Sequence, residues 1–332
     1  MRAVVIGSGA WGTTFAQVLA DAGNDVVVWT TQEAVAEEIN TRHTNGRHLP
    51  DGTVLPETLA ASTDLARLLP TAEVVVVALP SQVVRDVLTP YAGLVAPEAV
   101  VVSLMKGVEL STLEVMSQVL MEIWDLAPER MAVVSGPNLA GEIARREPTT
   151  TVVACRDDAV AHRIAEAIAT PYFRVFTSTD VIGLEIGGAV KNVIALAVGI
   201  AEGMGYGYNM VASIMTRGLS EGTRIGLAIG AERETFLGLA GVGDLVATCS
   251  SPSSRNHRLG SYIGKGLTLA EAVEATGATA EGAKSCRPIL ELARRHGVKA
   301  SVIAAVVAVV HEGRDPAQVV RELHDRPPRA ED

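Results

Sequence analysis

The residues best placed to do chemistry lie in a long apolar stretch that contains a single lysine. Apart from Glu185, Lys191 and Asn192, every residue in 182–201 is apolar or small. If this stretch is a helix, the neighbours that share the face of Lys191 are glycines and aliphatic residues, and Glu185 points elsewhere. Burial of this kind lowers the pKa of a lysine towards neutrality, where its amine can exchange protons with a bound molecule. The alternative is a lysine whose stem lies on apolar surface while its ammonium reaches water.

A carboxylate partner for Lys191 has to come from another part of the chain, and Asp244 is the candidate. Asp244 follows Gly241 and Gly243, and these glycines allow the backbone to come close to a neighbouring helix. A carboxylate there can hold the ammonium group in position through a charge-assisted hydrogen bond. The alternative is that Asp244 only caps a helix that starts at Leu245.

A glycine motif at the start of the chain predicts a dinucleotide site. A β-branched run at residues 3–6 leads into Gly-Ser-Gly-Ala-Trp-Gly and then into a helical pattern at 13–22. In this order of strand, turn and helix, Gly7 permits the tight turn, Gly9 lets the backbone approach a pyrophosphate, and Gly12 allows close packing. The start of the helix attracts the phosphates. The alternative is a tight turn with a purely structural role.

The choice between NAD and NADP stays open at the end of the second expected strand, residues 25–30. The acid that would bind a ribose 2′-hydroxyl is missing, because Thr31 and Gln32 follow and the first carboxylate is Glu33. No arginine stands there to bind a 2′-phosphate. Hydroxyl groups can serve either cofactor.

Later valine-rich runs predict more strands of the same sheet. Continuous apolar runs are typical of strands covered on both faces, as in a parallel sheet. The expected strands are 73–79, 99–104, 131–135, 150–154 and 173–176. Open α/β sheets bind ligands at the carboxyl ends of their strands, which makes Ser81, Lys106 and Asn138 candidates. The alternatives are helix caps for Ser81 and Asn138 and a solvated turn for Lys106.

The segment 250–256 predicts an anion site in the second half of the chain. It reads Ser-Ser-Pro-Ser-Ser-Arg-Asn and opens a helix with Arg255 in its first turn. Backbone donors at a helix start and a guanidinium group suit a phosphate. The alternative is a serine-rich surface loop.

The chain is long enough for two domains, and its strand signals stop near Ser178. With 332 residues, 48% of them hydrophobic and 20% charged, it has the composition of a globular protein with large cores. We expect an α/β domain of Rossmann type with a mostly parallel sheet at 1–178. An all-α domain that binds the substrate is expected at 179–332.

Bulk properties exclude several classes of function. The net charge of −10 without a basic cluster argues against a nucleic-acid surface. Three widely spaced cysteines fit reduced thiols rather than a disulfide framework, and no metal site is implied. No export signal precedes the first strand, and the most apolar runs, 193–201 and 301–310, are short for a membrane span. We therefore expect a cytoplasmic protein without membrane insertion.

Six short motifs, in this order along the chain, resemble bacterial NAD(P)-dependent glycerol-3-phosphate dehydrogenase. They are Gly7-Ser8-Gly9-Ala10-Trp11-Gly12-Thr13, Lys106-Gly107-Val108-Glu109, Ser135-Gly136-Pro137, Gly187-Gly188-Ala189-Val190-Lys191-Asn192-Val193, Gly241-Val242-Gly243-Asp244-Leu245 and Ser254-Arg255-Asn256. The resemblance implies reversible hydride transfer between NAD(P)H and dihydroxyacetone phosphate, which gives sn-glycerol 3-phosphate for phospholipid synthesis. It also implies a homodimer.

The same resemblance assigns roles to individual residues. Lys191 would be the general acid and base, with Lys106 and Asp244 beside it. Substrate contacts would come from Lys106, Gly136, Asn138, Lys191, Asn192, Asp244, Thr248, Ser254, Arg255 and Asn256. Cofactor contacts would come from Gly7, Gly9, Ala10, Trp11, Gly12, Thr31, Lys106, Ala140, Arg255 and Glu281. The sequence departs from the family pattern at Asn138, where serine or threonine is common, and at Thr31, where arginine or histidine is frequent.

Two other functions are weighed against this one. A β-hydroxyacid-type dehydrogenase has a similar layout, but that family separates its lysine and asparagine by two residues, whereas Lys191 and Asn192 are adjacent. A non-catalytic dinucleotide sensor would not need Lys191, Lys106 and Asp244 together.

Overall fold

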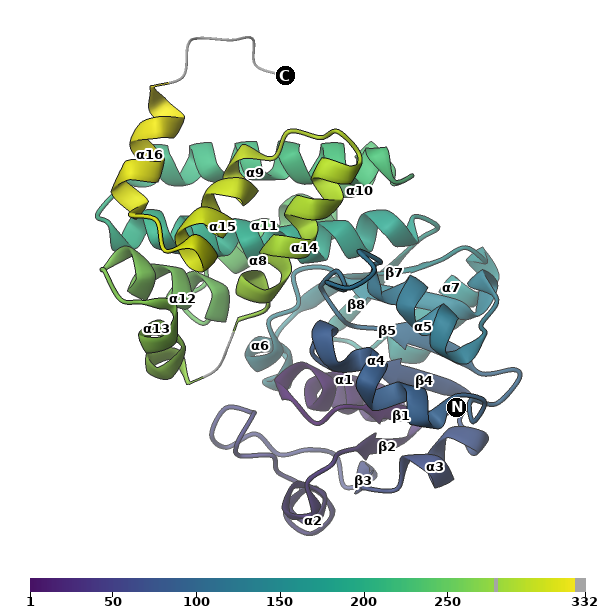
Figure 1. Cartoon of the computed structure of the whole chain (residues 1–332). Helices are drawn as coiled ribbons and strands as arrows, with labels where there is room; N and C mark the ends of the chain where they lie inside the picture. The colour runs from purple at the N-terminus through teal and green to yellow at the C-terminus, as the bar shows by residue number, and fades with distance from the viewer. Residues whose placement is uncertain (278–279, 326–332) are drawn as a thin grey trace.

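The computed structural model describes residues 1–277 and 280–325 as two lobes, a sheet flanked by helices and a bundle of helices (Figure 1). The sheet lobe comes first along the chain. The last residues of the expected helical domain, 326–332, lie outside the described residues.

The first lobe is built on one sheet of eight strands in the order β3-β2-β1-β4-β5-β6-β7-β8. The strands are β1 (Arg2–Ile6), β2 (Asp25–Trp29), β3 (Ala60–Ser62), β4 (Val74–Val77), β5 (Val100–Ser103), β6 (Met131–Ser135), β7 (Thr149–Cys155) and β8 (Phe173–Ser178). All neighbours pair in parallel except β6 and β7. The predicted mostly parallel sheet is confirmed. Strand β3 was not predicted, because an edge strand of three residues is too short to show a pattern.

Helices cover both faces of this sheet, which explains why β4 and β5 are buried along their whole length. The helices are α1 (Ala10–Asp21), α2 (Glu33–Arg42), α3 (Leu65–Leu68), α4 (Val84–Leu88), α5 (Met116–Trp124), α6 (Ala140–Ala144) and α7 (Asp158–Ile168). The strand order reverses its direction at β1, which lies between β2 and β4. The carboxyl ends of β1 and β4 are therefore the point at which such sheets bind ligands.

The second lobe is organised around α8, which runs from Val181 to Gly203. The other helices are α9 (Tyr208–Ala228), α10 (Arg233–Leu237), α11 (Asp244–Ser250), α12 (Arg255–Gly264), α13 (Leu269–Thr276), α14 (Glu281–Arg295), α15 (Ser301–Glu312) and α16 (Pro316–His324). A π-helical turn, Leu239–Gly243, precedes α11. Six of these helices, α9, α10, α11, α12, α14 and α15, pack directly on α8.

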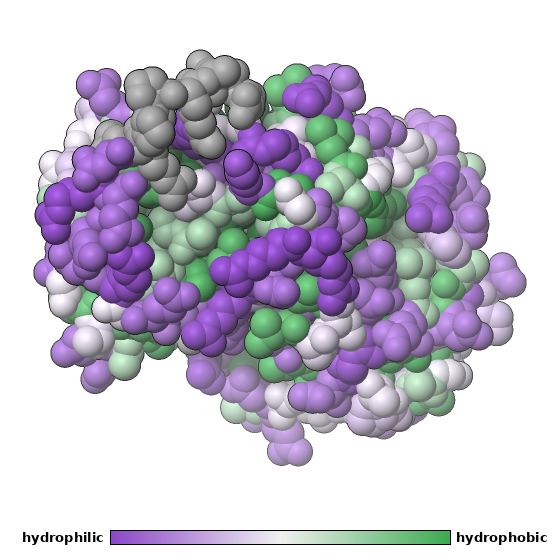
Figure 2. All heavy atoms as spheres, turned by 45° about the horizontal axis from the view of Figure 1, so that its top comes forward, coloured by the Kyte–Doolittle hydropathy of each residue, from purple (hydrophilic) through white to green (hydrophobic). Residues whose placement is uncertain are grey.

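The apolar helix α8 is longer than the run 193–201, which on its own is short for a membrane span. By length and composition α8 could cross a membrane, but 89% of its most apolar window is buried inside the structure. This burial identifies it as the core helix of the second lobe. The outer surface is more hydrophilic than this buried helix. Figure 2 shows a face of the molecule on which hydrophilic side chains predominate.

Paired glycines bring α8 and α12 into backbone contact. A methyl carbon placed on Gly260 would lie 2.2 Å from the carbonyl oxygen of Leu196, and one on Gly199 would lie 2.1 Å from that of His257. Gly203 and Gly264, one turn further along each helix, are equally close to the opposite backbone. Only glycine permits this approach, so the position of α12 is set by α8.

We expect Gly260→Ala to destabilise the protein, because the added methyl group has no room and the two helices must separate. Overpacking of this kind costs about 1–3 kcal/mol of the free energy of unfolding. Urea denaturation followed by circular dichroism measures the change. The matched control is Gly141→Ala in α6, where the nearest atom would lie 3.4 Å away and stability should be equal or slightly higher. Equal stability of the two variants would contradict the proposed tight contact.

Candidate active site

A single buried carboxylate holds two lysine ammonium groups between the lobes. Asp244 is 1% exposed, and its Oδ1 accepts a hydrogen bond of 2.7 Å from Lys191 Nζ. Its Oδ2 accepts one of 2.6 Å from Lys106 Nζ. Lys106 follows β5, Lys191 lies in the middle of α8, and Asp244 is the first residue of α11. The structure thus brings together three candidates that are far apart in the sequence. The side chain of Asp244 makes no capping bond, so its role is not that of a helix cap.

Lys191 is 9% exposed and has a second partner, the hydroxyl of Thr248, at 2.6 Å. This hydroxyl in turn donates to Asp244 Oδ1 at 3.3 Å. Burial lowers the pKa of Lys191 to about 8, the charge of Asp244 opposes this change, and the charge of Lys106 adds to it. Two of the three N–H donors of the ammonium are used, which leaves one for a ligand. A lysine of this kind can give or take a proton near neutral pH.

Glycines allow α8 to approach the other two elements of the cluster. A methyl carbon on Gly187 would lie 2.7 Å from the carbonyl oxygen of Ala240, just before Asp244. One on Gly188 would lie 3.2 Å from Lys106 Cγ. Lys106 Nζ also donates to the carbonyl oxygen of Gly136 at 3.2 Å, and Gly136 has a φ of +149° that favours glycine. The backbone therefore sets the spacing of the charged groups.

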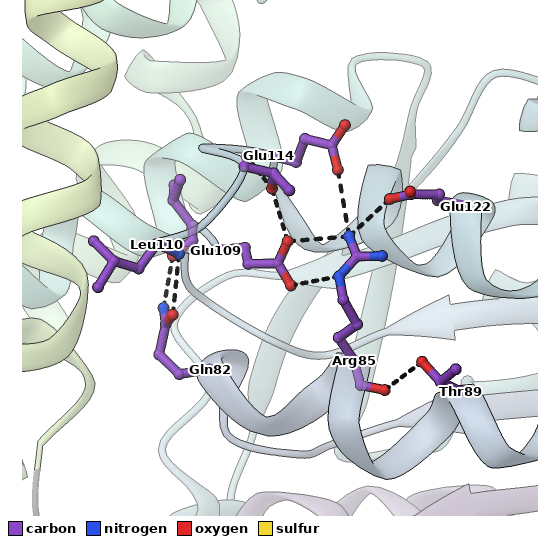
Figure 3. A network of polar contacts seen from close by, with 9 residues as sticks. Gln82, Arg85, Thr89, Glu109, Leu110, Glu114 and Glu122 are labelled. Atoms are coloured by element: carbon purple, nitrogen blue, oxygen red, sulfur yellow. Dashed lines mark hydrogen bonds and ion pairs between the residues drawn. The ribbon is translucent and has the colours of Figure 1, made fainter.

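The loop that carries Lys106 is held by side chains of the turn and helix that follow β4 (Figure 3). Gln82 binds the loop twice, since its Nε2 donates to Val108 O at 2.7 Å and its Oε1 accepts from Leu110 N at 3.1 Å. Arg85 forms a two-pronged ion pair with Glu109, with both N–O distances at 3.0 Å. The Glu109 carboxylate is shielded from water, with the residue 6% exposed, whereas the Arg85 side chain is 32% exposed. No role was predicted for Arg85, because nothing in the sequence connects it with Glu109.

A second group of polar residues lies beside Lys191 at the start of α12. Asn192 Oδ1 accepts from Asn256 Nδ2 at 2.9 Å, and Asn256 Oδ1 accepts from Gly282 N at 2.8 Å. The Ser254 hydroxyl accepts from His257 N at 3.3 Å and caps α12. Arg255 is exposed and forms no hydrogen bond or ion pair with any residue in the described ranges. A free guanidinium group therefore stands at a helix start, as an anion site requires, and Asn256 joins this helix start to Asn192, which follows Lys191 in α8.

The glycine turn after β1 fits the pyrophosphate of a dinucleotide. Gly7 has a φ of +117°, and a methyl carbon on Gly12 would lie 2.1 Å from Gly7 O. The same carbon on Gly9 would meet nothing within 4 Å, so this glycine faces open space instead of protein. Gly9 is also the N-cap of α1 and makes no side-chain capping bond, which leaves the N–H groups of the first turn to a ligand. Trp11 Nε1 is buried without a partner.

The remaining candidates lie around these two groups. Asn138 Nδ2 donates to Thr151 Oγ1 at 2.9 Å, and its Oδ1 is buried without a partner. Ala140 begins α6, and Thr31 is exposed after β2. Glu281 begins α14, and its carboxylate accepts from the Ser81 hydroxyl at 2.9 Å. This last bond joins the two lobes, so Ser81 acts as a link between them in the structure.

Comparisons with known proteins show which family the chain resembles over almost its whole length. The family model of the NAD-dependent glycerol-3-phosphate dehydrogenase N-terminus matches residues 2–161, and that of the C-terminus matches 180–321. Glycerol-3-phosphate dehydrogenase [NAD(P)+] of Streptomyces griseus is 54% identical over 331 residues, 100% of this chain and 98% of the relative, and that of Streptomyces coelicolor is equally similar. The crystal structure of glycerol-3-phosphate dehydrogenase from Coxiella burnetii superposes with a TM-score of 0.92 at 34% identity, covering 98% of this chain and 99% of that one.

We predict that Asp244→Asn lowers the pKa of Lys191 further below 8, because the substitution removes the negative charge that opposes the effect of burial. An opposite charge at this distance accounts for roughly 1 pKa unit or more. The pKa can be read from the 13Cε chemical shifts of labelled lysines, assigned with Lys191→Arg. Glu185→Gln is the control, since Glu185 is also buried in α8 but binds Ser117 instead. An unchanged pKa in Asp244→Asn would show that the carboxylate does not govern the amine.

Proposed function

Because the chain belongs to the NAD-dependent glycerol-3-phosphate dehydrogenase family, we propose that it interconverts dihydroxyacetone phosphate and sn-glycerol 3-phosphate, with Lys191 as the acid and base. The observation that carries this assignment is the buried Lys191 amine, held by Asp244 and Thr248 with one donor left for a ligand. The family match favours this reaction over a β-hydroxyacid-type dehydrogenase or a non-catalytic sensor. The product would serve phospholipid synthesis.

The cluster around Asp244 suits the charge that develops during ketone reduction. A bound nicotinamide cofactor supplies the hydride, and the C2 oxygen of the substrate becomes negative as the carbonyl bond is reduced. The Lys191 ammonium donates a proton to that oxygen, and Lys106 adds a second positive charge beside it. In the opposite direction the neutral amine of Lys191 accepts the proton of the alcohol. Its pKa of about 8 makes both forms available.

The substrate and the cofactor would then occupy neighbouring groups of residues. The start of α12 binds the substrate phosphate through Ser254, Arg255 and Asn256. Gly136, Asn138, Asn192 and Thr248 complete the substrate site. The cofactor is held by Gly7, Gly9, Ala10, Trp11, Gly12, Thr31, Lys106, Ala140, Arg255 and Glu281. The uncapped start of α1 and the open space at Gly9 support this placement.

We also propose the larger organisation of the protein. Residues 1–178 form the dinucleotide-binding domain and 179–332 the catalytic domain that binds the substrate. The protein is a cytoplasmic homodimer without membrane insertion. The support for the dimer is family resemblance together with apolar side chains that the second lobe leaves exposed, such as Tyr208 at 89% and Leu237 at 69%.

Lys191→Met should abolish most turnover while the cofactor still binds, because the variant keeps an apolar stem but cannot donate a proton. A general acid contributes about 10²- to 10⁴-fold to the rate. Oxidation of NADH and of NADPH with dihydroxyacetone phosphate measures turnover, and quenching of protein fluorescence measures cofactor binding. Lys299→Met, at an exposed lysine, is the control. A Lys191→Met enzyme as fast as the control would reject the assignment.

Arg255→Ala should raise the KM for dihydroxyacetone phosphate by about 10- to 100-fold, since a charged hydrogen bond to the phosphate is lost. At saturating cofactor, the kcat/KM for dihydroxyacetone, which has no phosphate, should hardly change. Arg258→Ala, one turn further along the exposed side of α12, controls for a general change in charge. If both substrates lose activity to the same extent, Arg255 does not bind the phosphate.

A further inference from the structure

The loop that follows α2, residues 43–49, folds back onto the glycine turn of the dinucleotide site. Asn45 is 1% exposed, and its Nδ2 donates to Ser8 O and to Thr13 Oγ1, both at 2.9 Å. Ser8 lies inside the glycine turn and Thr13 in the first turns of α1. The loop is therefore fixed to the element that would hold the pyrophosphate.

Helix α2 holds the same loop from its other side. Glu38 Oε1 accepts from Thr44 Oγ1 at 2.8 Å and from Gly46 N at 2.9 Å. These two hydrogen bonds hold the pKa of Glu38 below its usual value. The carboxylate is therefore charged at neutral pH and accepts both hydrogen bonds. With anchors at Thr44, Asn45 and Gly46, the position of the next residue, Arg47, follows from its neighbours.

Arg47 brings a positive charge to the end of β2. Its Nη1 donates to Gln32 Oε1 at 2.9 Å, although the two residues are 15 positions apart in the sequence. The guanidinium group is exposed and forms no ion pair with any residue in the described parts of the chain. Gln32 is the N-cap residue of α2, immediately after the end of β2 and Thr31. The arginine that the local sequence lacks at this strand end is supplied by the loop.

In doubly wound sheets the end of the second strand distinguishes the two nicotinamide cofactors. An acid there binds the ribose 2′-hydroxyl of NAD, whereas an arginine nearby accommodates the 2′-phosphate of NADP. Thr31 and Gln32 are uncharged, and Glu33, the first acid, begins α2 with an exposed side chain. A guanidinium group can bind a phosphate with two parallel hydrogen bonds.

We infer that Arg47 binds the 2′-phosphate and that the chain prefers NADP to NAD. This inference rests on the proposed function, because it requires a dinucleotide on the glycine turn. The surroundings of Arg47 favour an anion. Burial and the charges of Arg47 and Arg255 all lower the pKa of the neighbouring His48, so positive potential extends from the end of β2 towards the start of α12.

The test is the affinity of the whole protein for NADPH and NADH, measured by isothermal titration calorimetry without substrate. The wild-type protein should bind NADPH at least about tenfold more tightly than NADH. Arg47→Gln should weaken NADPH binding by about 10- to 100-fold, because charged hydrogen bonds are lost. Its affinity for NADH should stay within about twofold of the wild-type value. The affinity for adenosine 2′,5′-bisphosphate should fall in Arg47→Gln as the affinity for NADPH does. The affinity for 5′-AMP should stay unchanged, like that for NADH.

The control variant is Arg42→Gln, which removes the same charge from an exposed position in the last turn of α2. It should leave both affinities unchanged. Equal loss of NADPH and NADH binding in Arg47→Gln would mean that the residue only shapes the loop, and equal affinity of the wild-type protein for the two cofactors would remove the preference. Either result overturns this inference alone. A folded wild-type protein that binds neither cofactor would overturn the proposed function as well.

Discussion

The structure depends on one carboxylate that neutralises two ammonium groups away from bulk water. Asp244 receives Lys191 on one oxygen and Lys106 on the other, and the three side chains come from α11, α8 and the end of β5. Desolvation of such a group is costly unless every charge has partners. The cluster keeps one positive charge in excess before any ligand binds. It is therefore both an electrostatic link between the lobes and an arrangement that attracts an electron-rich oxygen.

Glycine is what allows the helices to deliver these groups at the required distance. Gly187 and Gly188 let α8 approach the segments that carry Asp244 and Lys106, and further along the same helix Gly199 does the same for α12. The glycines of α8 therefore determine both the packing of this helix and the geometry of the charged cluster. A substitution at the glycines where α8 and α12 are in contact would displace the start of α12, and with it Arg255, relative to Lys191.

Much of this arrangement can be predicted from the sequence, because its signals are local. The glycine motif after the first strand, the valine runs and the lone lysine in an apolar stretch each identify their own element. Most pairings between residues far apart in the chain cannot be read in this way. Lys191 with Asp244 is an exception, because the lone lysine and the glycines before Asp244 each mark their own position. Arg47 reaches the end of β2 only because Asn45 and Glu38 fix its loop, and the bond between Ser81 and Glu281 spans 200 positions. The paired glycines of α8 and α12 are visible in the sequence, but nothing there shows that the two pairs face each other.

The central position of α8 has a consequence for how the protein is made. The helix is complete at Gly203, yet α12 and α14, which cover it, end at Gly264 and Arg295. A ribosome that adds roughly 5–20 residues per second needs about 5–20 s to synthesise the last of this cover. Until that cover is complete, a segment apolar enough to pass for a membrane span lacks part of its native packing. The emerging chain therefore has to shelter α8 by transient collapse or by chaperone binding until the rest of the bundle leaves the tunnel.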